Sequence, residues 1–270
     1  MQILGTAASG LRAQQLALDT VSNNIANVNT VGFKSQEVDF AETLTTQLRP
    51  ANTVLPNGQV VPNAINVGAG VLYNSTGTDF QPGMVVGTGV STDIAIDGDG
   101  FFQVSLPDGQ TAYTRAGNFR LDGSGQLVDP QGNPLMPVIK VPAGMSKLTI
   151  SPNGEVRGTN AHGTEQTLGQ ITLATFPNPE SLLNTGDNLY VPSAATGPVQ
   201  TGAPGSPVAG QPGQPYPGNL GLLRGEALEQ SNVDLAKAMT DMIEVQRAYQ
   251  LNARMIQDGD QMWALANTMK

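Results

Sequence analysis

The chain has 270 residues, a net charge of −9, 13% charged and 5% aromatic residues, and no cysteine. The acidic balance argues against nucleic acid as a partner, because phosphate contacts need clustered Lys and Arg. The lack of cysteine excludes disulfides, thiol chemistry and Cys-based metal sites. No apolar run approaches the roughly 20 residues of a membrane span, and no signal peptide is visible at the N-terminus. This favours a cytoplasmic protein or one exported without a cleaved signal.

Residues 2–28 are predicted to form a long helix. Apolar and small residues recur there at alternating spacings of three and four, which is the heptad period of a coiled coil. They are Leu4, Ala7, Leu11, Gln14, Leu18, Val21, Ile25 and Val28. Asparagines then weaken the pattern, and Gly32 ends it, because Gly is the usual residue just past a helix end. An ordinary core helix is the alternative, which the narrow apolar stripe disfavours.

Residues 33–92 are predicted to be an extended connector. Phe33–Leu48 fits either a short helix or an extended chain. Arg49–Gly70 has prolines, an Asn57-Gly58 pair and consecutive valines, which favours extended segments and turns with an exposed hairpin. Glycines within Met84–Val90 favour a bulged strand over a helix.

Residues 93–195 are predicted to form an antiparallel β domain, either a sandwich or barrel-like, because turn dipeptides separate short alternating runs. The dipeptides are Asp97-Gly98, Asp99-Gly100, Asp108-Gly109, Asp122-Gly123 and Asn153-Gly154. The strand candidates are Asp93–Ile96, Phe101–Leu106, Thr111–Arg115, Gln126–Val128, Leu148–Ile150, Gly169–Phe176 and Asn188–Val191.

Residues 196–230 are predicted to be a Gly/Pro-rich linker and return segment, and residues 231–270 a second long helix. The helix is expected to start at a Ser231 cap and to be roughly 55–60 Å long. Its heptad seam is Leu235, Met239, Met242, Gln246, Tyr249, Ala253, Ile256, Asp260 and Trp263. A stripe of this length needs partners, namely the N-terminal helix and, because surplus apolar surface favours association, further copies of the chain.

Signals for an enzyme or a metal site are weak. His162, the one histidine, stands in a polar stretch without a second His or a nucleophile motif, which favours an exposed loop. Asp97 and Asp99 resemble the start of a calcium loop, but Phe101 stands at the next ligand position, which favours consecutive hairpin turns. The sequence therefore predicts no catalytic residue, cofactor or metal. A secreted module that binds a ligand through its β domain is the competing class, and it would need a large pocket or an aromatic patch there.

Four blocks of sequence, in the same order, resemble the rod and hook proteins of the bacterial flagellum. The blocks are Asn23–Asn27 with Thr30–Lys34, then Ala95–Val104, then Tyr113–Phe119, and finally Ser231–Asp234 with Met239, Met242-Ile243 and Gln246–Tyr249. The signature residues at the two ends are Asn23, Asn24, Asn27, Gly32, Phe33, Lys34, Gln246, Arg247, Ala248 and Tyr249. The resemblance covers nearly the whole chain.

The resemblance implies an α+β fold in which long N- and C-terminal helices pair as a coiled coil and an antiparallel β domain is inserted between them. It implies a non-enzymatic subunit that polymerises with itself into a hollow helical rod, with the helices inside and the β domain outside. The implied self-assembly interface is Leu4, Leu11, Leu18, Val21, Ile25, Leu235, Met239, Met242, Gln246, Tyr249, Ile256 and Trp263.

The implied partners are other rod proteins, the hook protein, the surrounding bushing rings and the flagellar export apparatus. The implied location is the periplasm-spanning rod of the basal body, reached without a cleaved signal peptide. Long helices with imperfect seams are marginal alone, so residues 1–30 and 231–270 are expected to be largely disordered in the monomer and to fold on assembly.

Within the family, the chain length, Arg49–Gly70 and Leu222–Glu229 resemble the distal rod branch, with proximal rod and hook paralogues as the alternatives. Two departures stand out. Ala238 replaces a common Glu, and Asp258–Asp260 is expected to interrupt the C-terminal helix, since Gly259 costs about 1 kcal/mol relative to Ala.

Overall fold

The computed structural model describes residues 2–49, 53–54, 60–61, 63–160, 163–207 and 219–268. The chain folds into two compact units. The helical unit comprises Met1–Ala26, Gln36–Gly77 and Asp234–Lys270, and the β unit comprises Asn27–Ser35 and Thr78–Val233. The α+β class predicted from the sequence is confirmed, with a helix near each end of the chain and antiparallel strands between them.

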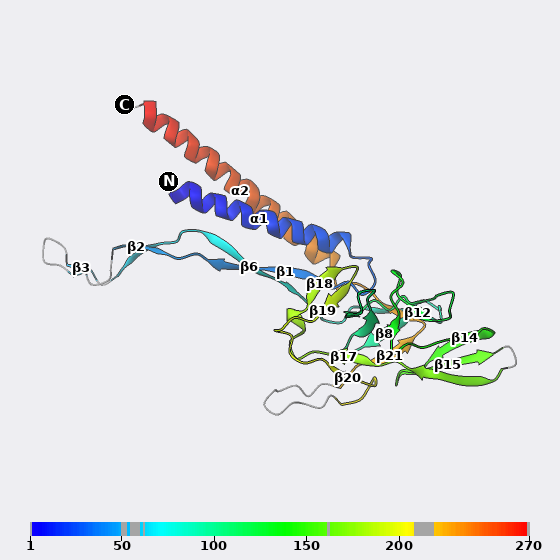
Figure 1. Cartoon of the computed structure of the whole chain (residues 1–270). Helices are drawn as coiled ribbons and strands as arrows, with labels where there is room; N and C mark the ends of the chain where they lie inside the picture. Colours follow the sequence, from blue (N-terminus) through cyan, green and yellow to red (C-terminus); the bar gives the residue numbers. More distant parts are fainter. Residues whose placement is uncertain are drawn as a thin grey trace. The chain divides into compact units, whose positions relative to one another are not determined.

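Two antiparallel helices dominate the helical unit: α1 (Gln2–Ala26) and α2 (Leu235–Thr268) lie side by side, with both chain termini at the same end of the pair (Figure 1). The predicted Ser231 cap is wrong by three residues. Asp234 is the cap, because its Oδ1 accepts hydrogen bonds from the backbone of Ala236 at 2.9 Å and of Lys237 at 3.2 Å. The expected interruption at Gly259 is also wrong, since α2 continues through it to Thr268.

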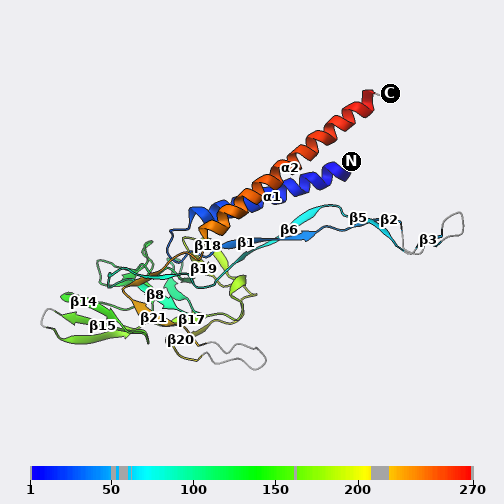
Figure 2. The ribbon, with the colours of Figure 1, turned by 180° about the vertical axis from the view of Figure 1, so that it is seen from behind.

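A long β-hairpin, here called the arm, completes the helical unit (Figure 2). Its three paired levels are β1 (Gln36–Glu42) with β6 (Val71–Thr78), β2 (Thr46–Arg49) with β5 (Ile65–Val67), and β3 (Thr53–Val54) with β4 (Val60–Val61). The hairpin predicted within Arg49–Gly70 is thus confirmed in the described residues, and Phe33–Leu48 is extended rather than helical. The Asn57-Gly58 pair lies outside the described residues.

Two larger antiparallel sheets organise the β unit. The first has the strand order β13 (Leu135–Met136), β9 (Phe102–Ser105), β10 (Thr111–Thr114), β19 (Leu189–Val191), β18 (Leu183–Gly186). The second joins β14 (Met145–Ile150), β15 (Glu155–Asn160) and β16 (Glu165–Gln170). A short 3-10 helix, η1 (Pro179–Ser181), precedes β18.

Four two-stranded pairs connect these sheets. They are β8 (Ile94–Asp97) with β21 (Leu222–Gly225), β7 (Val85–Gly87) with β22 (Ala227–Glu229), β11 (Arg120–Leu121) with β12 (Leu127–Val128), and β17 (Leu173–Thr175) with β20 (Gln200–Gly202). The described parts of residues 196–230 therefore pair with strands of the β unit, and Val85–Gly87 forms the strand expected within Met84–Val90.

The β unit has two adjoining apolar clusters. The larger contains fully buried aliphatic and aromatic side chains from the main sheet and its neighbours, such as Ile94, Phe102 and Leu135. The smaller is aromatic, and in it Tyr113 and Phe176 meet edge to face with ring centroids 4.8 Å apart. Both clusters belong to this unit alone, so it has a core of its own.

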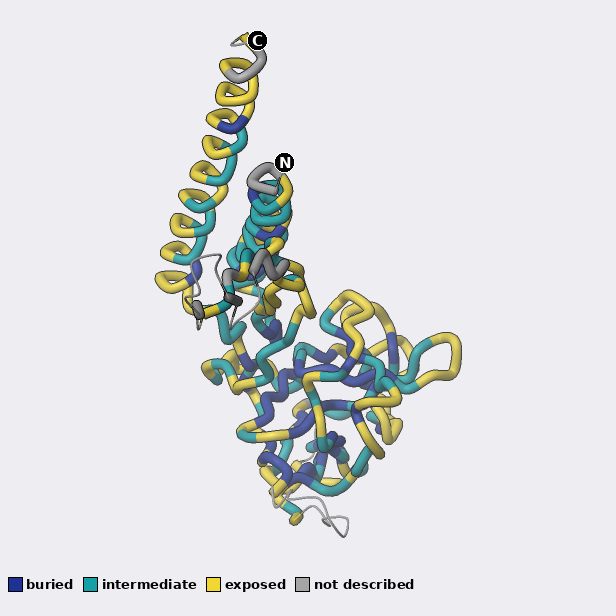
Figure 3. Tube along the Cα trace, turned by 90° about the vertical axis from the view of Figure 1, so that its left-hand side faces the viewer, coloured by how far each residue is buried: buried dark blue, intermediate teal, exposed yellow. Residues whose placement is uncertain are grey.

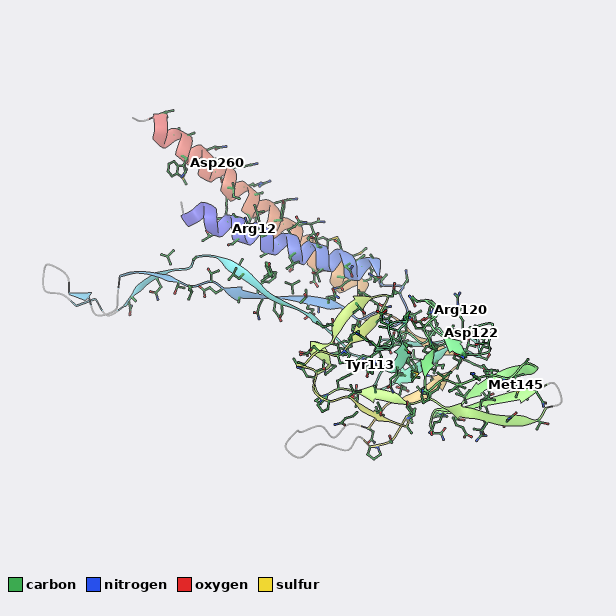
Figure 4. The ribbon with its side chains drawn as sticks, in the orientation of Figure 1. Arg12, Tyr113, Arg120, Asp122, Met145 and Asp260 are labelled. Atoms are coloured by element: carbon green, nitrogen blue, oxygen red, sulfur yellow. The ribbon has the colours of Figure 1, made fainter. Side chains whose placement is uncertain are left out.

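Some of the predicted hairpin turns are confirmed by the structure, and others differ from it. Gly109 and Gly154 have left-handed φ values of 77° and 86° and close the hairpins β9–β10 and β14–β15, as predicted. In the β11–β12 turn, Gly125 takes the left-handed position (φ 78°) and Gly123 does not. The carboxylate of Asp122 (Figure 4) accepts hydrogen bonds from the backbone of Ser124 and of Gln126, both at 2.8 Å.

The prediction of hairpin turns at Asp97–Gly100 is wrong. β8 pairs with β21, whereas β9 pairs with β10 and β13, so the segment joins two sheets instead of closing one hairpin. Phe101 makes this crossing by exchanging two backbone hydrogen bonds with Ala174, at 2.8 and 2.9 Å. The left-handed Gly98 and Gly100 allow the chain to turn between the sheets.

Candidate assembly surfaces

One side of α2, here called the inner row, consists of buried and half-buried residues, which Figure 3 shows in dark blue and teal along that side of the helix. Ala238 and Gly259 of this row are buried, and the half-buried members are Met242, Val245, Ala248, Asn252, Ala253 and Ile256. Asn252 lies against Gly10 of α1, where an added Cβ would come within 3.0 Å of the Asn252 Nδ2. The inner row is therefore the side of α2 that packs on α1.

The predicted heptad seam is only partly this packing face. Met242, Ala253 and Ile256 belong to the inner row. The other predicted members Leu235, Met239, Gln246, Tyr249, Asp260 and Trp263 are exposed. Small residues explain the shift, because Gly and Ala permit a closer approach of two helices than the large side chains that defined the predicted seam.

Large apolar side chains therefore remain uncovered on α2 in the single chain. The outer surface of α2 comprises Leu235, Met239, Ile243, Tyr249, Leu251, Met255, Met262 and Leu265, which are 37–64% exposed. Charged residues such as Asp260 lie among them (Figure 4). So much exposed apolar area along one helix indicates a surface that is buried by association.

The predicted interface residues of α1 lie between two neighbours. Leu11, Leu18, Val21 and Ile25 are half-buried, and the side chain of Leu4 lies outside the described residues. The arm contacts another side of α1, where Ser9 Oγ accepts a hydrogen bond from the Val71 backbone at 3.3 Å. Asn24 exchanges two hydrogen bonds with the backbone of Gln36, at 2.8 and 3.0 Å. This signature asparagine therefore fixes the start of the arm to the end of α1.

Three charged side chains from distant parts of the sequence meet inside the β unit. Lys34 Nζ donates to Glu229 Oε1 at 2.6 Å and to the Gln81 carbonyl at 2.7 Å. Arg115 Nη1 donates to the Gly98 carbonyl at 2.8 Å and lies 3.5 Å from Glu229 Oε2. The side chains of Lys34 and Glu229 are fully buried, and that of Arg115 is 2% exposed. Glu229 thus balances two buried cations in what we call the ion cluster.

Burial dominates the electrostatics of this cluster. It lowers the pKa of Lys34 and that of Arg115 below their ordinary values, although attraction to Glu229 opposes both shifts. The Arg115 guanidinium also lies 5.2 Å from the centre of the Phe101 ring. Burial raises the pKa of Tyr190 to about 12, against the attraction of Arg115. At both cations, attraction to Glu229 is the largest effect that opposes the loss of hydration.

The ion cluster adjoins residues 31–35 and 229–233, two segments of the β unit that each end where the chain leaves this unit for the helical unit. Gly32 N–H donates to the Glu229 carbonyl at 2.9 Å, and Ser35 N–H donates to Asn232 Oδ1 at 2.7 Å. Gly32 has φ 67°, and a Cβ there would lie 2.5 Å from the backbone nitrogen of Ala116, so no larger residue fits. The two segments are therefore held next to each other, within the β unit.

The remaining signature residues divide by location. Phe33 is buried, and Asn27 Oδ1 accepts a hydrogen bond from Thr30 Oγ1 at 3.1 Å, whereas Asn23 is exposed. In the C-terminal signature, Ala248 is half-buried and Gln246, Arg247 and Tyr249 are exposed. The N-terminal signature is therefore mostly used within the chain, while the C-terminal signature presents side chains outward.

Sequence reasoning missed the structural roles of Glu229 and Asn232. Glu229 stands 195 positions from Lys34, and no local pattern connects the two. A signal was present in retrospect, because Lys34 and Arg115 each stand inside a block rich in apolar and small residues, where a charge needs a buried partner.

Neither a metal site nor a membrane span emerges from the described residues. They contain no group of three or more His, Asp or Glu side chains arranged to hold a metal ion. His162 lies outside them. Among the described helices, none combines the length and apolar character needed to cross a membrane. The described aromatic side chains of the β unit are buried or half-buried, which leaves no aromatic patch on its described surface.

Three family models match the chain, and together they include nearly all of both helices and the strands β9 to β14. Residues 4–34 match "Flagella basal body rod protein", residues 95–158 match "Flagellar hook protein FlgE/F/G D1 domain", and residues 224–269 match "Flagellar basal body rod FlgEFG protein C-terminal". Lys34 lies in the first of these matched regions, Arg115 in the second and Glu229 in the third. The ion cluster therefore joins all three matched regions.

Curated relatives match over nearly the full length. The flagellar basal-body rod protein FlgG of Caulobacter vibrioides is 40% identical over 264 residues, covering 97% of each chain. FlgG of Borreliella burgdorferi is 38% identical over 273 residues, covering 100% of this chain and 99% of that protein. The flagellar hook-basal body complex protein FlhP of Bacillus subtilis is 30% identical, covering 98% of each.

Proposed function

This chain belongs to the family of flagellar basal-body rod proteins, and from that premise we propose that it is a structural subunit that polymerises into the distal rod. The observation that carries the proposal is the outer surface of α2, where the single chain leaves large apolar side chains exposed. In a polymer, neighbouring copies bury this surface. The distal branch is favoured because FlgG relatives reach 40% identity, against 30% for the hook-basal body protein FlhP.

In this proposal the two sides of α2 pack against different partners. The inner row packs on α1 of the same chain, and the outer surface packs on other copies. A contact that joins two different surfaces of identical subunits continues without closing, and this produces a helical polymer. The proposed interface between copies comprises the predicted residues outside the inner row, including the half-buried Leu11 and Leu18 and the exposed Met239 and Tyr249, whereas the predicted residues Met242 and Ile256 pack on α1 of the same chain.

The same assignment of contacts, within the chain and between copies, suits the architecture of a rod. The helical units, paired as coiled coils, form the inner tube, and the β units form the outer layer. The arm adds contacts along the rod. Other rod proteins and the hook protein bind at the two ends, the bushing rings surround the outer layer, and the export apparatus delivers the chain to the periplasm-spanning rod. The role is structural, and the proposal involves no catalytic step.

Electron microscopy of the purified protein under polymerising conditions tests the proposal. A straight, stiff rod is the expected product, a curved flexible tube would indicate a hook-like paralogue, and no polymer at any concentration would contradict the proposal.

Two charge substitutions test the interface itself. Tyr249→Asp and Leu11→Asp each place a charge where assembly buries an apolar group, so both should abolish polymerisation. The β unit should remain folded, because neither residue belongs to it. Tyr249→Phe and Leu11→Met are the matched controls, which keep the apolar surface and should assemble. A variant with either aspartate that still forms rods would refute the assignment of that residue.

A further inference from the structure

The arm lacks the feature that usually fixes the register of paired strands. Its first level pairs β1 with β6, and the structure describes every residue of these two strands (Figure 2). All of these residues are half-buried or exposed. Register is strongly specified where one face of a strand is buried, because a slip of one residue would turn the apolar side chains to the solvent, and it is weakly specified where both faces are exposed. A strand pair of this kind needs contacts from outside to hold its register.

An asparagine from a distant part of the sequence contacts the residues that flank these two strands. Ser35 precedes β1 and Asp79 follows β6, and Asp79 N–H donates to the Ser35 carbonyl at 2.8 Å. In a regular antiparallel pair, a second hydrogen bond would run from Ser35 N–H to the Asp79 carbonyl. Here Ser35 N–H donates to Asn232 Oδ1 at 2.7 Å, and Asn232 Nδ2 donates to the Asp79 carbonyl at 2.8 Å. The carboxamide thus takes the place of the second hydrogen bond and bridges the two strand ends.

Backbone hydrogen bonds hold Asn232 in this place. Its own N–H donates to the Phe33 carbonyl at 3.4 Å, and two residues earlier Gln230 N–H donates to the Met84 carbonyl at 2.9 Å. Asn232 is half-buried, and its Nδ2 also lies 3.3 Å from the Gln81 carbonyl. The backbone of this segment therefore keeps the carboxamide between the two strand ends.

Asn232 differs from the other side chains that hold the arm. Asn24 and Ser9 contact the arm from α1, so they act only when this helix is folded. Asn232 and both of the residues that it bridges belong to the β unit, which has a core of its own. Although residues 231–270 are expected to be largely disordered in the monomer, the contacts of Asn232 need no folded helix.

We propose that Asn232 is a positioning residue that sets the register of the arm. Its carboxamide holds Ser35 opposite Asp79, and the strands that continue from this pair are aligned by it. Four residues further along each strand, Ser75 Oγ donates to Asp39 Oδ2 at 3.3 Å, so the same register persists into the arm. The inference concerns the single chain and does not depend on polymerisation.

Pairs of introduced cysteines can measure this register, because the chain has no cysteine of its own. Asp39→Cys with Ser75→Cys should form a disulfide in the native register, whereas Asp39→Cys with Gly77→Cys should do so only after a slip of two residues. The ratio of the two rates of disulfide formation is measured in the monomer, with and without Asn232→Asp. This substitution keeps the shape but leaves no donor for the Asp79 carbonyl. The ratio should fall about tenfold or more, as expected when hydrogen bonds to both strand ends are weakened or lost.

Asn74→Asp is the matched control. It makes the same chemical change at an exposed position of β6, and the ratio should stay within about twofold of wild type, as for most surface substitutions. Near-UV circular dichroism shows whether the β unit of each variant is folded. A folded Asn232→Asp variant whose ratio matches that of the control would overturn the inference.

Amide hydrogen exchange of the wild-type monomer gives a second measurement that needs no variant. The N–H of Ser35 should be protected to within about tenfold of the N–H of Asp79, because both are hydrogen-bonded in the same folded unit. If Asn232→Asp does not fold, this measurement decides. An unprotected Ser35 beside a protected Asp79 would show that the carboxamide does not hold the strand end, and the inference would be wrong.

Discussion

Replacement of Glu229 by Gln should strongly destabilise the β unit. Among the described residues, Glu229 is the acidic side chain that forms ion pairs with both Lys34 and Arg115, at 2.6 and 3.5 Å. Glutamine keeps the shape and the oxygen that accepts the Gly83 backbone hydrogen bond at 2.8 Å. It removes the charge, however, and with it the largest attraction that opposes the desolvation of the two buried cations, since Asp79 attracts Lys34 and Asp99 attracts Arg115 less strongly. Removing one partner of a buried ion pair costs about 3–5 kcal/mol, and here two cations depend on the same carboxylate.

The matched control lies three residues away. Glu226 pairs with Lys147 at 3.1 Å, but their side chains are 45% and 62% exposed. Solvent screens such a pair, so Glu226→Gln should change the free energy of unfolding by about 0–1 kcal/mol. The two substitutions make the same chemical change, one at a buried carboxylate with two cationic partners and the other at an exposed carboxylate with one.

Thermal and urea unfolding of the monomer, followed by tyrosine fluorescence and near-UV circular dichroism, measure both variants. For a unit of this size, each kcal/mol of lost unfolding free energy lowers the thermal midpoint by about 2–4 °C. Glu229→Gln should therefore lower the midpoint temperature of unfolding by roughly 6–20 °C. Adding Lys34→Met should recover part of the loss, because one uncompensated cation disappears. Equal shifts for Glu229→Gln and Glu226→Gln would refute the argument that the ion cluster stabilises this unit.

Three further predictions concern helix packing, alkaline stability and monomer folding. Gly10→Leu should raise the critical concentration for polymerisation by an order of magnitude or more, because Asn252 occupies the space beside Gly10. Gly5→Leu is the control and should leave the critical concentration unchanged, since nothing lies within 4 Å of a Cβ at that position. Equal effects of the two substitutions would argue against close helix packing. The raised pKa of Tyr190, about 12 against the ordinary 10.0, means that the folded state holds this proton more tightly. That stability, of order 2 kcal/mol, is complete below about pH 10 and is lost as the pH rises through about 12. Tyr190→Phe should weaken this loss in alkaline unfolding, and an unaltered pH profile would contradict it. Finally, residues 1–30 and 231–270 are predicted to be largely disordered in the monomer, so far-UV circular dichroism should show helicity rising on polymerisation; strong helicity beforehand would count against this.

The sequence predicted the elements well where the signal is local. Heptad spacing located both helices, and pairs such as Asp108-Gly109 and Asn153-Gly154 marked real hairpins, because a left-handed glycine at a tight turn is a property of a few consecutive residues. The same rule failed at Asp97–Gly100. There the glycines serve a crossing between two sheets, and the pairing of Phe101 with Ala174, a distant residue, decides the path of the chain.

The packing face of α2 could not be read from large apolar residues. Those residues define a heptad pattern through Leu235, Met239 and Tyr249, but the helices approach where side chains are smallest, at Ala238 and Gly259 of α2 and at Gly10 of α1. Gly259 illustrates the difference. Its helix propensity predicts a weak point that costs about 1 kcal/mol, whereas in the structure the helix continues through it and Gly259 is buried in the inner row.

The two units divide stability between the monomer and the polymer. The β unit contains its own apolar clusters, and its charged residues Lys34, Arg115 and Glu229 form ion pairs inside it. The helical unit instead leaves side chains such as Met239 and Leu251 exposed at 52% and 59%. Burying several such side chains contributes about 1.5–3 kcal/mol each when they become fully covered, and this gain exists only in the presence of other copies. A chain built in this way can keep a folded β unit at low concentration and still delay helix pairing until a neighbour is present. Substitutions in the ion cluster should therefore change unfolding of the monomer, whereas substitutions on the outer surface of α2 should change the critical concentration alone.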